Sequence, residues 1–180
     1  MKFSYRLSAR WRPASSGRQP KAESRQLTMP TPFQIDIANE QSLLPVDEAR
    51  LAEIAERILT DAGVRCGVLS IAVVDDATIQ RLNKEFLQHD YPTDVLSFAL
   101  DEDFDAFEGE VLVSAETARH NAAQFGWPPE KELALYVIHG TLHLAGYRDK
   151  TPGDQAAMRE AETRYLRTLD SQEAIEGALL

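Results

Sequence analysis

Cysteine is almost absent from this sequence of 180 residues, and long apolar segments are missing altogether. Cys66 is the single cysteine, so an internal disulfide is excluded, and the composition fits a protein of the reducing cytoplasm. It stands in an apolar stretch, which is typical of a small buried side chain. No apolar run approaches the roughly 20 residues that cross a membrane, so we expect no membrane partner.

Basic side chains are scarce in most of the chain. Residues 1–28 contain seven Lys and Arg against one acidic residue, a net charge of +6. The remaining residues contain 12 against 28, or −16, so the formal net charge is −10. An acidic body of this kind repels the phosphate backbone, which excludes a general nucleic-acid-binding protein. Any nucleic-acid contact must therefore be confined to a few side chains or be arranged by a partner.

The basic segment at residues 1–29 allows three interpretations. It is a flexible nucleic-acid-binding arm, a targeting sequence rich in Arg and Ser, or an over-extended start with translation beginning at Met29. It lacks the apolar region of about 7–15 residues that a secretory signal requires. We favour the over-extended start, because sequence typical of a folded domain begins directly after Met29. In each case we expect the segment to be disordered.

Hydrophobic periodicity predicts one α/β (α+β) domain over residues 30–170, followed by a tail at 171–180. Alternating or β-branched apolar runs predict four strands, at 33–37, 68–74, 95–100 and 111–114. Capping residues and helical spacing predict five helices: 47–60, 76–87, 115–125, a helix that starts at 128–130 and is ended by Gly146, and 151–169. An acidic loop is expected at 101–108. These elements predict a mixed four-stranded sheet with about five helices around it.

Two of the chain's four histidines, His139 and His143, stand four residues apart in one of these helices. Residues at this spacing lie on one helix face about 6 Å apart, so both imidazoles can reach one metal ion. The alternative is a pair of partly buried structural histidines. Apolar residues occupy almost every side of the predicted helix, which indicates a helix at the centre of the fold. Burying an imidazole there without polar partners would cost free energy. The pair therefore indicates a metal site on a central helix.

Asp149 is the third candidate ligand. Gly146 can adopt the left-handed conformation that ends a helix, and the chain then turns back to Asp149. Three protein ligands with one open position are the arrangement of a catalytic zinc site, with one zinc per chain. A carboxylate makes the bound water less acidic than a third imidazole would and also suits manganese or iron. The alternative for Asp149 is a solvated turn residue.

Gly140 follows the first histidine directly. In metallopeptidases with the pattern His-Glu-x-x-His, this position carries the general-base glutamate, so a peptidase of that type is disfavoured. A glycine here leaves room either for a bulky group near the metal or for close packing of the helix. Both interpretations stay open.

Three blocks of sequence carry a family resemblance. The first is His139–Tyr147, the second is Leu82-Asn83 followed by Asp90–Phe98, and the weaker third is Gly109–Ser114. Together they resemble the YbeY family of bacterial endoribonucleases and rRNA maturation factors. The resemblance implies the same fold, with zinc in a cleft between the central helix and the sheet edge. It also implies single-strand-specific RNA cleavage in the cytoplasm, maturation of the 16S rRNA 3′ end and ribosome quality control. The implied partners are ribosomal RNA, the ribosome or small-subunit assembly factors.

Two positions depart from the family pattern. The family usually ends the first block with a histidine as third metal ligand, and this chain has Asp149 there. Leu87 falls where the family usually carries an arginine associated with RNA cleavage, and leucine cannot hold a phosphate. One hypothesis is that Arg148 or His89 takes over this role. The alternative is that both are ordinary surface residues.

Two carboxylates in the matched blocks, Asp94 and Glu110, are candidates for a general base. Asp94 could instead hydrogen-bond a ligand histidine or cap local amides in a turn. Two rival functions remain. One is a metallohydrolase of another substrate, such as a peptide or a small phosphoester. The other is a ribosome-assembly binding factor with a structural metal, in which Leu87 marks lost catalysis.

Overall fold

The computed structural model describes residues 33–101 and 107–178. The basic segment at 1–29 and most of the predicted acidic loop lie outside these residues. The described strands are β1 (Gln34–Asn39), β2 (Gly67–Val74), β3 (Val95–Asp101) and β4 (Phe107–Ser114). The described helices are α2 (Glu48–Asp61), α3 (Asp76–Leu87), α4 (Ala115–Phe125), α5 (Pro129–Leu144) and α6 (Pro152–Ala178).

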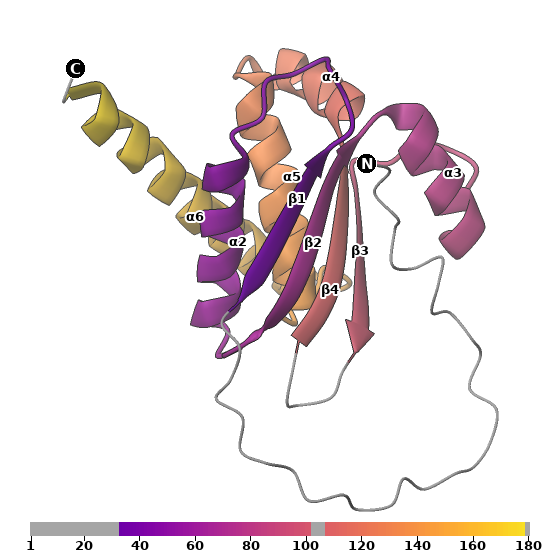
Figure 1. The fold of residues 1–180 in the computed structure, drawn as a ribbon, viewed down its shortest axis with the longest axis horizontal. Helices are drawn as coiled ribbons and strands as arrows, with labels where there is room; N and C mark the ends of the chain where they lie inside the picture. The colour runs from indigo at the N-terminus through magenta and orange to yellow at the C-terminus, as the bar shows by residue number, and fades with distance from the viewer. Residues whose placement is uncertain (1–32, 102–106, 179–180) are drawn as a thin grey trace, which may run out of the picture.

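Within the described residues, the strands form one mixed sheet of four strands in the order β1-β2-β4-β3 (Figure 1). β1, β2 and β4 are parallel, and β3 runs antiparallel to β4. The predicted fold class is confirmed. β4 begins earlier than predicted, at Phe107, because Phe107–Glu110 pair with Gly67–Ser70 of β2. The backbone hydrogen bonds of this ladder extend the strand into acidic sequence that carries no apolar alternation.

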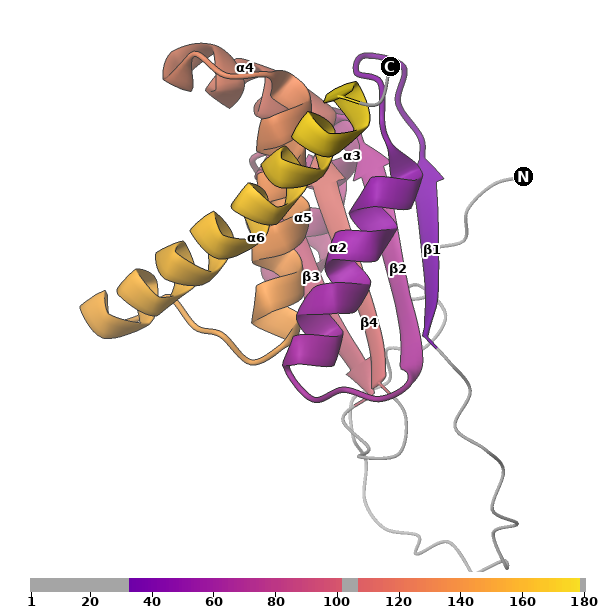
Figure 2. The same ribbon diagram turned by 90° about the vertical axis from the view of Figure 1, so that its left-hand side faces the viewer.

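The two faces of the sheet are covered by different helices. Leu69, Ile71 and Val111 point to the face on which α2 and α5 lie, and they belong to the larger core cluster. The neighbouring Ala72 and Leu112 point the other way, into a smaller cluster with α3. This alternation is the two-residue period of a strand. Figure 2 shows α6 as an outer layer over α2 and α5.

Helix α5 lies at the centre of the fold, where it contacts α2, α4, α6 and strands β3 and β4. Its approach to the sheet is close at Gly140. A Cβ atom there would lie 2.8 Å from Cγ1 of Val111 and 2.9 Å from Cγ2 of Val95, which is shorter than a normal carbon–carbon contact. Of the two interpretations of Gly140, close packing of the helix on the sheet is therefore correct.

Two further sequence predictions needed correction. Helix α6 continues to Ala178, past the predicted end near Leu169. Cys66 is half-buried, whereas a fully buried side chain was expected. Within the described part of the chain, no helix combines the length and apolar character that a membrane crossing requires.

Candidate metal centre

The end of α5 is built by the turn that the sequence predicts. Gly146 has a φ of +96°, the left-handed conformation that glycine adopts without strain. The amide of Gly146 donates to the carbonyl of His143 at 3.0 Å, and the amide of Tyr147 donates to that of Leu142 at 3.0 Å. This pair of bonds is the Schellman motif, which caps a helix end and reverses the chain. The reversal brings Asp149 back to the histidines.

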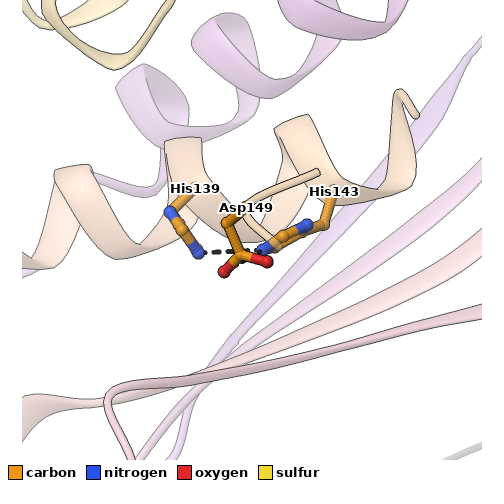
Figure 3. Close-up of side chains that lie close together, drawn as sticks. All are labelled: His139, His143 and Asp149. Carbon is orange, nitrogen blue, oxygen red and sulfur yellow. Dashed lines mark hydrogen bonds and ion pairs between the residues drawn. The ribbon is translucent and has the colours of Figure 1, made fainter. Parts of the chain in front are cut away.

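His139, His143 and Asp149 point toward one another (Figure 3). One ligand atom from each residue lies within 4.8 Å of the other two, so the cluster can hold a metal ion. The two histidine Nε2 atoms are 3.0 Å apart, and Nε2 of His143 is 3.7 Å from Oδ2 of Asp149. The structure thus brings together the three residues that the sequence predicted as ligands.

The hydrogen bonds of the two rings leave both Nε2 lone pairs facing the cluster. His143 Nδ1 lies 3.1 Å from the carbonyl oxygen of Tyr147, which can only accept, so Nδ1 carries the proton. His139 Nδ1 lies 2.6 Å from Oε1 of Glu162, a carboxylate that likewise accepts. Nε2 of each neutral ring is therefore an acceptor. The 3.0 Å hydrogen bond between the two Nε2 atoms needs a proton on one of them, and a metal ion bound by both rings would take the place of that proton.

The donor atoms lie close enough together to share one metal ion, such as zinc. Zinc bonds of about 2.0–2.2 Å at tetrahedral angles place ligand atoms roughly 3.3–3.6 Å apart. Two of the observed separations are 3.0 Å and 3.7 Å, and all three lie within 4.8 Å, so the donors are near this spacing without matching it. The side chain of Asp149 is 51% exposed, whereas those of His139 and His143 are 26% and 28% exposed. The cluster is therefore accessible to solvent on the side of Asp149.

The electrostatic surroundings of His139 favour a cation. Burial has the largest single effect on its pKa and lowers it. The hydrogen bond and charge of Glu162 oppose this effect, and the charges of Asp94 and Asp149 add to them, so the pKa is raised above the ordinary imidazole value. The same negative charges that stabilise a protonated ring would stabilise a metal ion.

Glu162 is the residue of this site that the sequence analysis missed. It lies on α6, 23 residues after His139, and its side chain is 17% exposed. The position carries no spacing or capping signal relative to the histidine pair. Only the packing of α6 over α5 brings its carboxylate to the imidazole.

The other candidate residues lie around the cluster in different ways. Oδ1 of Asp94 accepts hydrogen bonds from Thr93 Oγ1 and the Val95 amide, both at 2.9 Å, as expected of a turn carboxylate. Its charge nevertheless acts on His139. Glu110 is fully buried on β4, next to Val111, which faces Gly140. Strand alternation therefore turns Glu110 to the opposite face of the sheet, which α3 covers.

The residues considered for phosphate binding are all on the surface. Arg148 is exposed, directly before Asp149. Leu87 is 48% exposed at the end of α3. His89 follows it in the α3–β3 connection, where its ring stacks on Tyr91 with centroids 5.4 Å apart.

Comparison with known proteins decides the family. The family model described as "Endoribonuclease YbeY" matches residues 36–170. This chain belongs to the YbeY family. The protein named Endoribonuclease YbeY from Rhodopirellula baltica is 44% identical over 127 residues, which are 68% of this chain and 66% of that protein. The YbeY protein of Carboxydothermus hydrogenoformans is 41% identical over 138 residues, 74% of this chain and 96% of that protein.

The YbeY fold is also found in a solved structure. A solution structure of a Thermotoga maritima protein matches 79% of this chain and 93% of its own, with 31% identity and a TM-score of 0.58. The resemblance inferred from the three sequence blocks is therefore confirmed. For the Rhodopirellula YbeY protein, the match spans just under two thirds of its length.

Proposed function

We propose that this protein is an endoribonuclease that cleaves single-stranded RNA with one zinc ion per chain, held by His139, His143 and Asp149. The observation that carries the proposal is the convergence of two imidazole lone pairs and a carboxylate within 4.8 Å. Membership of a family whose model is named for endoribonuclease activity supports the choice of RNA as substrate.

The ligand residues and their supports have distinct roles in this proposal. His139 and His143 bind through Nε2, because their Nδ1 protons are donated to Glu162 and to the Tyr147 carbonyl. Asp149 adds a negative charge, and the side of the metal centre on which it lies is accessible to substrate. A zinc ion held by these three residues would supply Lewis-acid chemistry, activating water and stabilising negative charge on a phosphate.

Phosphate contact is assigned to an exposed cation beside the ligands. Arg148 precedes Asp149 and is exposed, so its guanidinium can reach a phosphate in front of the cluster. His89 is the second candidate. Asp94 remains a candidate general base through its charge near His139. Glu110 is a weaker candidate, because strand alternation turns it to the face of the sheet away from α5.

The proposed biological role is maturation of the 16S rRNA 3′ end and ribosome quality control in the cytoplasm. The partners are single-stranded ribosomal RNA and the ribosome or small-subunit assembly factors. The acidic balance of the chain supports a partner that arranges the contact, since its net charge of −10 opposes unaided RNA binding.

One observation favours a second function. Leu87 replaces the arginine that the family usually carries, and its exposed side chain offers no charge to a phosphate. In the alternative, the protein is a ribosome-assembly factor in which the metal is structural. A metallohydrolase of peptides or small phosphoesters is the third option.

The deciding experiment compares substrates on the purified, zinc-loaded protein and on His139→Ala. We expect cleavage of single-stranded RNA, little cleavage of duplex RNA, and no activity in the variant or after chelation. Cleavage of peptides or small phosphoesters instead of RNA would identify a different hydrolase. Ribosome association that survives in the wild type without any cleavage would favour the assembly factor.

The phosphate contact is tested separately with Arg148→Ala and His89→Ala, using the exposed neighbour Lys150→Ala as control. A hydrogen bond to a charged group contributes about 1.5–3 kcal/mol, so losing the contact should lower kcat/KM about tenfold or more. If both variants cleave RNA as the wild type does, neither residue replaces the family's arginine.

A further inference from the structure

The carboxylate of Glu162 is the one acidic group of α6 that touches a candidate ligand in the described structure. Its Oε1 lies 2.6 Å from Nδ1 of His139, a short separation typical of a hydrogen bond with a charged partner. The side chain is 17% exposed, whereas the neighbouring Glu160 is on the solvent side of the same helix. The contact is therefore specific to one helix position.

Helix α6 holds this carboxylate on a rigid support. Met158, Ala161 and Tyr165 are buried and belong to the main core cluster, on the same side of the helix as Glu162. The hydroxyl of Tyr165 also donates to Oδ2 of Asp61, at the end of α2, over 2.9 Å. These contacts fix the position of the helix, so the backbone of Glu162 is held within reach of His139.

The two histidines differ in what they donate to. His143 donates its Nδ1 proton to the neutral carbonyl of Tyr147 at 3.1 Å. His139 donates to an anionic carboxylate at 2.6 Å. A carboxylate partner fixes the ring orientation, keeps the proton on Nδ1 and makes Nε2 a stronger electron donor. His139 should therefore be the stronger of the two imidazole ligands.

We propose that Glu162 is a positioning residue of the metal centre, which acts through His139 and makes metal affinity depend on the docking of α6. This inference rests on the proposed function, because it needs a metal at His139, His143 and Asp149. Glu162 does not itself touch the metal or the substrate. Its effect is exerted on the orientation and donor strength of one ring.

The test measures zinc affinity of the metal-free full chain by competition with a chromophoric chelator. Glu162→Ala removes the acceptor, and we expect zinc affinity to fall about 10- to 100-fold, the usual effect of losing such a partner. Glu162→Gln keeps an acceptor without the charge and should give an intermediate loss. Glu160→Gln removes a charge from the exposed side of the same helix and should bind zinc as the wild type does.

Two further readouts separate positioning from a merely structural role. Cobalt(II) bound in place of zinc should show an altered visible spectrum in Glu162→Gln, while the metal-free variant unfolds at the wild-type temperature. Wild-type affinity in both Glu162 variants, or a lower unfolding temperature with an unchanged cobalt spectrum, would overturn the inference. If the wild type itself binds no zinc or cobalt, the proposed metal centre fails, and this outcome is distinguishable from the others.

Discussion

Asp149 is the candidate ligand at which the sequence departs from the pattern that the family resemblance implies. Nδ1 of His139 is hydrogen-bonded to Glu162, and Nδ1 of His143 is hydrogen-bonded to the Tyr147 carbonyl. Asp149 stands in the turn after α5, and its side chain is about half exposed. It is therefore the least buried of the three candidate ligands, and the one whose replacement should disturb the fold least.

At this scale, we expect Asp149→Ala to bind zinc much more weakly than the wild type, because two neutral donors remain and the negative charge is lost. Asp149→His should restore strong binding with a neutral ligand set. Elemental analysis of proteins purified without added metal measures both, with Glu56→Ala on α2 as an exposed control. Equal metal content in the wild type and Asp149→Ala would remove Asp149 from the site.

The position of α5 against the sheet depends on the missing side chain at Gly140. The helix approaches Val111 and Val95 so closely that a methyl group would be under 3.0 Å from both. The valine side chains are branched and stiff, so they cannot turn aside. The same close approach determines the distance between the histidine pair and the sheet.

We therefore expect Gly140→Ala to destabilise the protein by about 1–3 kcal/mol through overpacking. This outcome is opposite to the gain of about 1 kcal/mol that alanine gives in an unconstrained helix. Urea unfolding measures the difference. The matched control is Gly153→Ala in the first turn of α6, where a new Cβ would meet only Thr151 Oγ1 at 3.8 Å. A neutral or stabilising effect of Gly140→Ala would show that the helix can shift.

Helix α3 begins at an aspartate that caps it. Oδ1 of Asp75 accepts from the Thr78 amide at 2.8 Å. Hydrogen bonds from the Thr78 side chain and then from its amide lower the pKa of Asp75 below 3.8. Because the folded pKa is lowered, the cap contributes its full stability above the unfolded value and loses it as pH falls through the folded pKa.

From this cap we expect Asp75→Ala to be less stable than the wild type by roughly 1 kcal/mol near neutral pH. The difference should shrink as the pH falls below 3.8, the unfolded value. Asp75→Asn keeps a cap that does not titrate, so its stability relative to Asp75→Ala should not depend on pH. The free energy of unfolding of the three proteins, measured between acidic and neutral pH, tests this prediction. A difference in this free energy between wild type and Asp75→Ala that stays constant with pH would contradict it.

At the scale of the whole molecule, the charge distribution limits how the proposed RNA substrate could be held. Residues 29–180 have a net charge of −16, whereas residues 1–28 have +6. Each phosphate that a protein neutralises on a single strand adds about −0.7 to the slope of log affinity against log salt. A domain with one or two cationic contacts therefore binds with little salt dependence.

We expect a slope of about −1.5 or shallower for single-stranded RNA and the domain beginning at Met29. Fluorescence anisotropy between low and moderate salt measures it. The full chain should show a steeper slope only if its basic N-terminal segment binds RNA. A slope steeper than about −3 for the Met29 form would reveal a broad phosphate-binding surface on the domain.

Much of this molecule was predictable from short stretches of sequence. The four strands, the five described helices and the Gly146 cap follow from periodicity and turn residues that act over a few positions. The histidine pair followed from helical spacing, and Asp149 from the turn after it. Boundaries were less accurate at β4 and α6. Pairing with β2 extends β4 beyond its local signal, and α6 continues to Ala178.

By itself, the sequence determined the family, the order of the elements and the three residues that converge. Only the tertiary structure decided what surrounds them. It placed Glu162 behind His139, decided that α5 covers the face of the sheet away from Glu110, and showed that Gly140 serves helix packing. The physical reason is that these contacts join residues far apart in the chain. They depend on how α5, α6 and the sheet lie against one another, and no local pattern encodes that arrangement.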